Sequence, residues 1–434
     1  MSTAGLILDH VSGKTLPIDV GQNVCFNLNA LQTLGTLDSL DHDLLRLASY
    51  IYAADLGVKR SEREQHLRSI TVTVPVVNLQ AFERNRSSIE SALTTLSCDN
   101  WNLNFTQSAV MVPAVAVNWP GRGNSTLMFS GGLDSFAGAA KLLQSEAQTF
   151  LVSHTTRNRP VKVAQEALAA SVNAEFSNKG KHIQIRVSLR NFRSFTFPSD
   201  DDREDTQRTR SFLFCSLSAI VAHLTRTERI VVMAENGQFA IHLPLTEARA
   251  GAFSTHTAHP KFLSETQEIF RELFLCKDLE ILNPFLYSTK GEVVNGIPET
   301  LRDKISKSVS CWRASRIPTR FSHCGECVPC LCRRVALESN GIVLKEYERD
   351  LLKENIGALK SDDRGKRNLI DLCQFISFFG GPNSISLDQE VCYQFPELFD
   401  SNLDATKAIG MYRRFAKEAL AVLGKYRNVK NLMK

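Results

Sequence analysis

The sequence predicts an α/β fold in which a parallel sheet with helices on both faces forms the core. In residues 121–335, short apolar runs alternate with helical stretches. The residues before this region contain strictly alternating strands together with helices, and those after it contain amphipathic helical patterns only. A chain of 434 residues is long enough for two or three domains. We therefore expect an N-terminal α+β domain at 1–120 and a C-terminal helical region at 336–434.

The N-terminal domain is expected to combine helices at 44–54 and 89–96 with strands at 70–76 and 101–105. It ends in a stretch rich in turn-forming residues, 119–123. In the core, strands are expected at 127–129, 149–153, 183–187 and 230–233, and helices at 136–143, 161–172 and 211–224. The C-terminal region is expected to contain helices at 369–379 and 409–423. Ligands of such a core bind at the carboxyl ends of the strands.

Composition narrows the class of protein. Hydrophobic residues make up 43% of the chain, which is ordinary for a globular protein. No apolar run approaches the length of a membrane span, and no secretory signal is visible at the N-terminus, so a cytoplasmic protein is expected. The formal charge of +5 permits an anionic ligand but does not imply nucleic acid.

The most informative motif is Ser-Gly-Gly-Leu-Asp-Ser at residues 130–135, between an expected strand and an expected helix. Gly131 and Gly132 permit a tight turn and a close approach of the backbone. Unpaired N–H groups at the helix start attract anions, so the motif predicts a phosphate site. The Gly-Lys-Ser/Thr ending of the Walker loop is absent. The alternative is a plain strand-to-helix turn.

This hexamer resembles the PP-loop of the ATP pyrophosphatases, which cleave ATP to AMP and pyrophosphate while adenylating a substrate. Ser130, Gly131, Gly132, Asp134 and Ser135 match that loop and are the expected ATP-binding residues, with Asp134 and Ser135 also catalytic candidates. Either Asp134 helps to hold Mg²⁺, or it caps the helix.

A cysteine cluster provides the second motif. Cys324, Cys327 and Cys330 have Cys-x2-Cys-x2-Cys spacing, and Cys311 lies thirteen positions before the first of them. Four thiolates are the usual ligands of structural Zn²⁺, and a reducing compartment favours metal over disulfides. Buried free cysteines are the other alternative, and Cys332 competes with Cys330 as the fourth ligand.

Together the two motifs resemble 7-cyano-7-deazaguanine synthase. That family carries the PP-loop and then Cys…Cys-Gly-x-Cys-x-x-Cys-x-x-Arg, whose last position is Arg333 here. Residues 283–285 and 288–292 resemble the family's Pro and Lys-x-Glu segment. The resemblance covers residues 121–335 and implies the PP-loop ATP pyrophosphatase fold, ATP as a substrate and a deazaguanine-type small molecule.

Further site residues follow from position and from this resemblance. His154 ends the second core strand, near the expected nucleotide, unless it is merely a polar strand-end residue. Arg210 resembles the family's Arg-Asn pair, although Ser211 replaces the Asn. Lys290 is either a catalytic phosphate contact or a surface lysine.

The segment from Glu235 to His259, expected to bind the substrate, differs most from the synthase family. Glu235 and Asn236 are candidates for recognition of a guanine-like base, because a carboxylate matches two adjacent N–H donors. Arg249 is a candidate for binding a carboxylate. His256 and His259 suggest acid/base or metal chemistry, but no third ligand is evident.

The length of the chain and the segments 52–55 and 99–101 resemble the long QueC-like proteins of bacterial antiphage defence clusters, including the Qat system. That resemblance implies an ATP-dependent carbon–nitrogen ligase that joins 7-carboxy-7-deazaguanine to an amine, with an operon-encoded, QatB-like protein as partner. Two alternatives stay open: a metabolic synthase that makes the nitrile for tRNA modification, and a non-catalytic nucleotide-binding scaffold.

Overall fold

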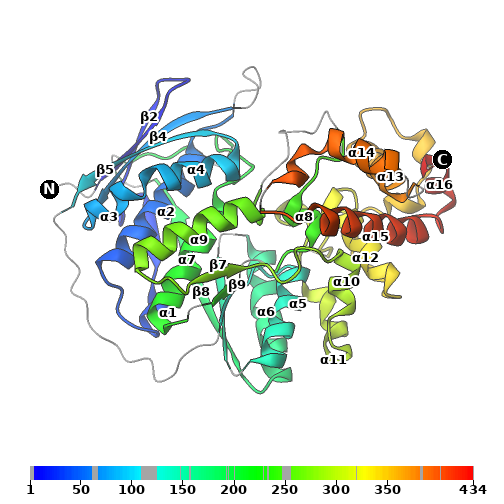
Figure 1. Cartoon of the computed structure of the whole chain (residues 1–434), viewed down its shortest axis with the longest axis horizontal. Helices are drawn as coiled ribbons and strands as arrows, with labels where there is room; N and C mark the ends of the chain where they lie inside the picture. The colour runs from blue at the N-terminus through cyan, green and yellow to red at the C-terminus, as the bar shows by residue number, and fades with distance from the viewer. Residues whose placement is uncertain are drawn as a thin grey trace.

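The computed structural model describes residues 4–60, 67–108, 125–146, 148–155, 158–191, 193, 195–199, 201–227, 229–231, 234–246, 256–318, 320–381, 385–400 and 402–433. Figure 1 shows a central sheet with the N-terminal sheet and helices on one side and the C-terminal helices on the other. None of the helices in these ranges is long and apolar enough to cross a membrane.

The central sheet has the strand order β10-β9-β6-β7-β8-β3. Its strands are β3 (Val24–Asn27), β6 (Ser125–Met128), β7 (Thr149–Thr155), β8 (Gly180–Leu189), β9 (Arg229–Val231) and β10 (Glu280–Leu282). Neighbouring strands from β10 to β8 run parallel, as expected, whereas β3 pairs antiparallel with β8. The expectation of a wholly parallel sheet built from residues 121–335 is therefore wrong at this edge, because a strand from the N-terminal region completes the sheet.

Helices cover both faces of this sheet. The helices α5 (Leu133–Ser145) and α6 (Arg159–Glu175) pack on one face, and α7 (Arg210–Thr225) packs on the other. Side chains of β7 alternate accordingly: Leu151 joins the cluster of α5 and α6, while Phe150 and Val152 join the cluster of α7. Both faces are buried, which explains the continuous apolar runs of these strands.

The N-terminal region forms a second sheet with the order β2-β1-β4-β5. Its elements are β1 (Gly5–Asp9), β2 (Thr15–Ile18), α1 (Asn29–Gln32), α2 (Ser39–Gly57), β4 (Ser69–Val76), α3 (Leu79–Arg84), α4 (Arg86–Ser97) and β5 (Asn100–Gln107). Helix α2 begins at a capping box formed by Asp38 and Asp41. It is buried along most of its length because it packs against β4 on one side and α7 on the other.

The remaining helices follow the central strands. They include α8 (Gly237–Ile241), α9 (Pro260–Phe274), α10 (Lys290–Asn295), α11 (Glu299–Arg302), α12 (Val328–Ser339), α13 (Arg364–Gly380), α14 (Ile385–Gln394), α15 (Ala405–Leu423) and α16 (Arg427–Lys430). Helix α9 packs against α4 and α7, and so joins the N-terminal region to the core. Helix α15 packs against α8, α10, α12 and α13, so the C-terminal region lies directly on elements of the core.

The expected elements are present, mostly with longer bounds. The helix expected at 44–54 lies within α2, and the strand expected at 70–76 lies within β4. Residues 119–123 and the last two residues of the strand expected at 230–233 lie outside the described residues. The domain limits at 120 and 335 remain predictions.

Candidate functional site

Residues 130–135 connect β6 to α5 at the carboxyl edge of the central sheet. Gly131 has a φ of +81°, and a Cβ atom there would come within 3.1 Å of the Gln165 backbone nitrogen. Only glycine fits this position, because it combines a left-handed backbone with a close neighbour. Gly132 is the N-cap of α5, and no side chain caps the helix. The start of the helix is therefore available to an anion.

The two serines of the loop bond to each other and to its backbone. The Ser130 hydroxyl accepts from the Gly132 N–H at 3.2 Å and lies 3.2 Å from the Ser135 hydroxyl. Ser135 also donates to the Gly132 carbonyl at 3.0 Å. The loop is thus held in shape by short-range bonds, and both hydroxyls lie where a phosphate at the helix start would reach them.

Asp134 connects this loop to two distant segments. Its carboxylate forms an ion pair with Lys290, the first residue of α10, and accepts from the Asn236 amide at 3.2 Å. The Asp134 carboxylate does not cap α5. Lys290 is only 3% exposed, so the alternative of a surface lysine is wrong. The structure therefore brings Asp134, Lys290 and Asn236 together, as a shared site requires.

Glu235 lies beside this group. It accepts from the Asn236 amide at 2.7 Å, and its backbone carbonyl accepts from Asn283 at 2.9 Å. Burial raises the pKa of Glu235 well above its usual range; the Asp134 carboxylate raises it further, and the Lys290 ammonium opposes the shift. A carboxyl group poised in this way can bind a base edge or hold a proton.

His154 and Arg210 form a second group on the neighbouring part of the same edge. His154 is fully buried, and neither ring nitrogen has a well-formed hydrogen bond to a described residue. Burial lowers the pKa of His154 to about 3, and the Arg210 charge acts in the same direction, so the ring is neutral. The Arg210 guanidinium pairs with no carboxylate among the described residues. Gln165 joins this group to the loop, donating to the carbonyls of Ser130 at 3.3 Å and His154 at 3.4 Å.

Of the remaining candidates, the two histidines have other partners. Arg249 lies outside the described residues. The His256 and His259 rings are 5.1 Å apart, but His256 contacts the Thr95 carbonyl and His259 accepts from the Lys261 N–H at the start of α9. No third metal ligand joins them among the described residues.

The four expected zinc ligands form a buried cluster. The sulfurs of Cys311, Cys324, Cys327 and Cys330 all lie within 4.8 Å of one another. The Cys324 and Cys330 sulfurs are 3.8 Å apart, close to the separation that tetrahedral ligation at about 2.3 Å requires. The N–H groups of Arg313 and Cys324 donate to the Cys311 sulfur at 3.3 and 3.4 Å, as they would to a thiolate. Cys332 is not a member, which resolves the competition in favour of Cys330.

The cysteine cluster is tied to the PP-loop by Arg333, a fully buried residue of α12. Its guanidinium pairs with Glu346 at 2.6 Å and donates to the Ser308 hydroxyl at 2.8 Å. The next residue, Val309, donates its N–H to the Gly131 carbonyl at 3.0 Å. Sequence reasoning identified Arg333 only as a motif position; the Glu346 partner carries no sequence signal.

Sequence reasoning also missed how Lys290 is held. Thr289 is the N-cap of α10 in a capping box with Glu292, and its hydroxyl donates to the Glu418 carboxylate of α15 at 2.6 Å. The capping-box spacing Thr-x-x-Glu was visible in the sequence. The contact with Glu418 was not, because it spans 129 residues.

The cysteine cluster predicts a specific difference between two variants. Cys330→Ser should release zinc and lower the free energy of unfolding by several kcal/mol, because metal binding free energy is also folding free energy. Cys332→Ser should keep its zinc, since its thiol lies outside the cluster. Metal analysis and thermal unfolding of both purified variants test this. Zinc loss from Cys332→Ser but not from Cys330→Ser would contradict the ligand set.

The raised pKa of Glu235 predicts a pH-dependent stability difference. At pH values between the ordinary pKa of 4.5 and the raised pKa of the folded state, Glu235 holds a proton in the folded protein and releases it in the unfolded chain. Stability contributed by Glu235 therefore falls as pH rises through this interval. Glu235→Gln removes this loss, so its advantage in melting temperature over wild type should grow from about pH 5 to about pH 8. An advantage that does not change with pH would contradict the burial of this carboxyl.

Comparison with known proteins adds one finding. The family described as "Queuosine biosynthesis protein QueC" matches residues 124–341, which is just over half of the chain. No curated protein matches. The matched region contains the PP-loop, the Asp134–Lys290 pair, Glu235 and the four clustered cysteines. The chain therefore belongs to the QueC family.

Proposed function

We propose that this protein is an ATP-dependent carbon–nitrogen ligase of the antiphage-defence, QueC-like type. It adenylates 7-carboxy-7-deazaguanine and transfers the acyl group to an amine on a partner protein, releasing AMP and pyrophosphate. The QueC family carries out ATP-dependent, 7-deazaguanine-related chemistry. The observation that carries the proposal is the convergence of Asp134, Lys290 and Asn236 beside Glu235 at the PP-loop.

The phosphate side of the site has fixed donors and cations. The start of α5 and the hydroxyls of Ser130 and Ser135 supply donors to the phosphates. Lys290 supplies a buried positive charge beside them. Charge grows on the departing pyrophosphate, so donors that are already in place favour its release. Mg²⁺ bound with ATP would neutralise further charge, and Asp134 is the residue that would hold it.

The base side is assigned to Glu235 and Asn236. In the proposal, the adjacent N–H groups of the bound deazaguanine and the Lys290 ammonium together favour the ionised form of Glu235. The carboxylate then accepts from those N–H groups, which a neutral amide could satisfy only in part. The Asn236 Oδ1 atom is buried and has no partner in the described chain, so it is a second acceptor for the base. Arg249 is retained as a candidate for the substrate carboxylate.

The protein acceptor is supported by the parts of the chain outside the family match. Strands β1, β2, β4 and β5 form a sheet that packs with helices, and α13 to α16 form the C-terminal helices; the matched region includes none of these elements. Ammonia needs no docking surface, whereas a partner of the QatB-like type does. The reduced thiols required by the cysteine cluster favour a cytoplasmic location.

One alternative has a specific observation in its favour. The matching family is described as a queuosine biosynthesis protein, which favours a synthase that makes the free nitrile for tRNA modification. A non-catalytic scaffold is less favoured, since none of the PP-loop residues is replaced.

The ATP part of the proposal predicts loss of pyrophosphate release. Ser130→Ala and Asp134→Asn should each lower the rate by roughly 10²-fold. The first removes a hydroxyl donor to the phosphates, and the second removes the negative charge that holds Lys290 and would hold Mg²⁺. Ser145→Ala, at the other end of the same helix, is the matched control and should keep the wild-type rate. Wild-type turnover in both loop variants would reject the assignment.

The product part predicts a modified partner. Protein, ATP, Mg²⁺ and 7-carboxy-7-deazaguanine are incubated with the operon-encoded partner, and the partner is examined by intact mass. We expect a deazaguanine-sized amide adduct on the partner, which Glu235→Ala should reduce by roughly 10-fold because the base loses its acceptor. Free nitrile with an unmodified partner would instead identify the metabolic synthase.

A further inference from the structure

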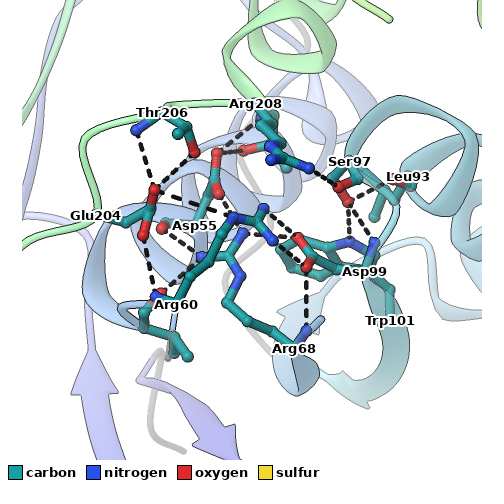
Figure 2. A network of polar contacts seen from close by, with 12 residues as sticks. Asp55, Arg60, Arg68, Leu93, Ser97, Asp99, Trp101, Glu204, Thr206 and Arg208 are labelled. Atoms are coloured by element: carbon teal, nitrogen blue, oxygen red, sulfur yellow. Dashed lines mark hydrogen bonds and ion pairs between the residues drawn. The ribbon is translucent and has the colours of Figure 1, made fainter. Parts of the chain in front are cut away.

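Charged side chains are buried together where the N-terminal region meets the segment that leads into α7 (Figure 2). Carboxylates and guanidinium groups occur in equal number, and each is nearly inaccessible to solvent: Asp55, Arg60, Arg68, Asp99, Glu204 and Arg208. Burying charges is costly unless every charge is paired and hydrogen-bonded. Such a network indicates that the relative position of the N-terminal region and the segment before α7 is important for the protein.

The centre of the network lies within the N-terminal region. Arg68 pairs with Asp55 at 2.5 Å and with Asp99 at 2.7 Å, and it donates to the carbonyls of Asp55 and Val58 at 2.8 and 2.6 Å. Arg60 makes two bonds to the same Asp99, at 2.5 and 2.7 Å. Asp55 and Asp99 belong to the two segments that resemble the long QueC-like proteins.

The network then reaches across to the core. The Asp55 carboxylate accepts from the N–H and the hydroxyl of Thr209, at 2.8 and 3.1 Å. Arg208 donates to the Ser97 carbonyl at 2.8 Å. Arg208 and Thr209 follow Gln207 in the chain. Before Gln207, the Glu204 carboxylate accepts from the Thr206 hydroxyl at 2.7 Å. Both sides of Gln207 are therefore held by the network.

Gln207 itself has a left-handed backbone, with a φ of +46°. A non-glycine residue keeps such a conformation only where its surroundings enforce it. Tyr52, one turn before Asp55 in α2, donates its hydroxyl to the Gln207 side chain at 3.3 Å. The Gln207 carbonyl in turn accepts from the Arg210 N–H at 3.2 Å. We call this turn at Gln207 the corner. Its bond to the Arg210 N–H fixes the position at which Arg210 begins α7.

The Arg210 guanidinium pairs with no carboxylate in the described part of the chain, and its charge lies near His154. The ring of His154 is also met edge-on by Tyr52, with 5.6 Å between ring centroids. Helix α2 of the N-terminal region therefore contacts the nucleotide side of the site through Tyr52 and through the corner that Asp55 holds.

We propose that the N-terminal region is a working part of the nucleotide site, in which Asp55 is a positioning residue that holds the Gln207 corner and so aims Arg210 at an ATP phosphate. This rests on the proposed use of ATP. A network with a merely structural role would hold the two regions together without affecting Arg210 specifically.

A double-mutant cycle separates these roles. Affinity for a non-hydrolysable ATP analogue is measured by equilibrium titration for wild type, Asp55→Asn, Arg210→Ala and the double variant. We expect Arg210→Ala to weaken binding roughly tenfold and Asp55→Asn several-fold. In the Arg210→Ala background, Asp55→Asn should have almost no further effect, because the residue it positions is gone.

A second variant tests the proposal even if Asp55→Asn does not fold. Gln207→Gly leaves every charge of the network in place and adopts a positive φ without strain, so it should fold like wild type. Because residue 207 is then less constrained and Arg210 is less well positioned, the Gln207→Gly protein should nevertheless bind the analogue several-fold more weakly. Asn178→Gly, another left-handed residue but at the amino end of β8, is the matched control and should bind normally.

Two results would overturn the proposal. Folded Asp55→Asn and Gln207→Gly variants that bind the analogue as tightly as wild type would show that the corner does not position Arg210. An equal loss from Asp55→Asn in both backgrounds would show a merely structural role. A wild type that does not bind the analogue would reject the use of ATP as well, whereas the first two results leave it intact.

Discussion

The buried ion pair between Asp134 and Lys290 is the contact around which the site is built. It joins the start of α5, which follows the PP-loop, to the start of α10, more than 150 residues later. Removing two charges from water is costly, so the pair needs further polar contacts. Asn236 supplies one to Asp134, and Glu235 lies beside the pair with a raised carboxyl pKa. A phosphate that enters would meet Lys290 already in place.

Regions on both sides of the family match support this pair and its surroundings. From the C-terminal side, Glu418 of α15 accepts from Thr289, the cap of α10, and so fixes the residue before Lys290. From the N-terminal side, Asp55 of α2 binds Thr209, directly before Arg210. Helix α2 is buried nearly throughout because it lies between the N-terminal sheet and α7. The flanking regions are thus packed into the site.

Local patterns predicted what depends on local interactions. The period of the apolar residues located β4, α2 and α15, and a short apolar run located β7. The glycine turn and the cysteine spacing located the PP-loop and the metal cluster. Contacts between distant segments gave no such signal. The edge strand β3 pairs with β8 across 159 to 165 residues of sequence, and nothing in its four residues marks it as part of the core sheet. The partners of Lys290 and Asp55 were likewise invisible, because a single sequence does not show which charges meet.

The most direct test of the central claim is the fate of oxygen during the reaction. Substrate 7-carboxy-7-deazaguanine is labelled with ¹⁸O in its carboxylate and incubated with the protein, ATP, Mg²⁺ and the amine acceptor, and the released AMP is analysed by mass spectrometry. If the carboxylate oxygen attacks the α-phosphorus, AMP carries one ¹⁸O atom after transfer to the amine. Unlabelled AMP, or ADP and phosphate in place of AMP and pyrophosphate, would contradict adenylation of the carboxylate.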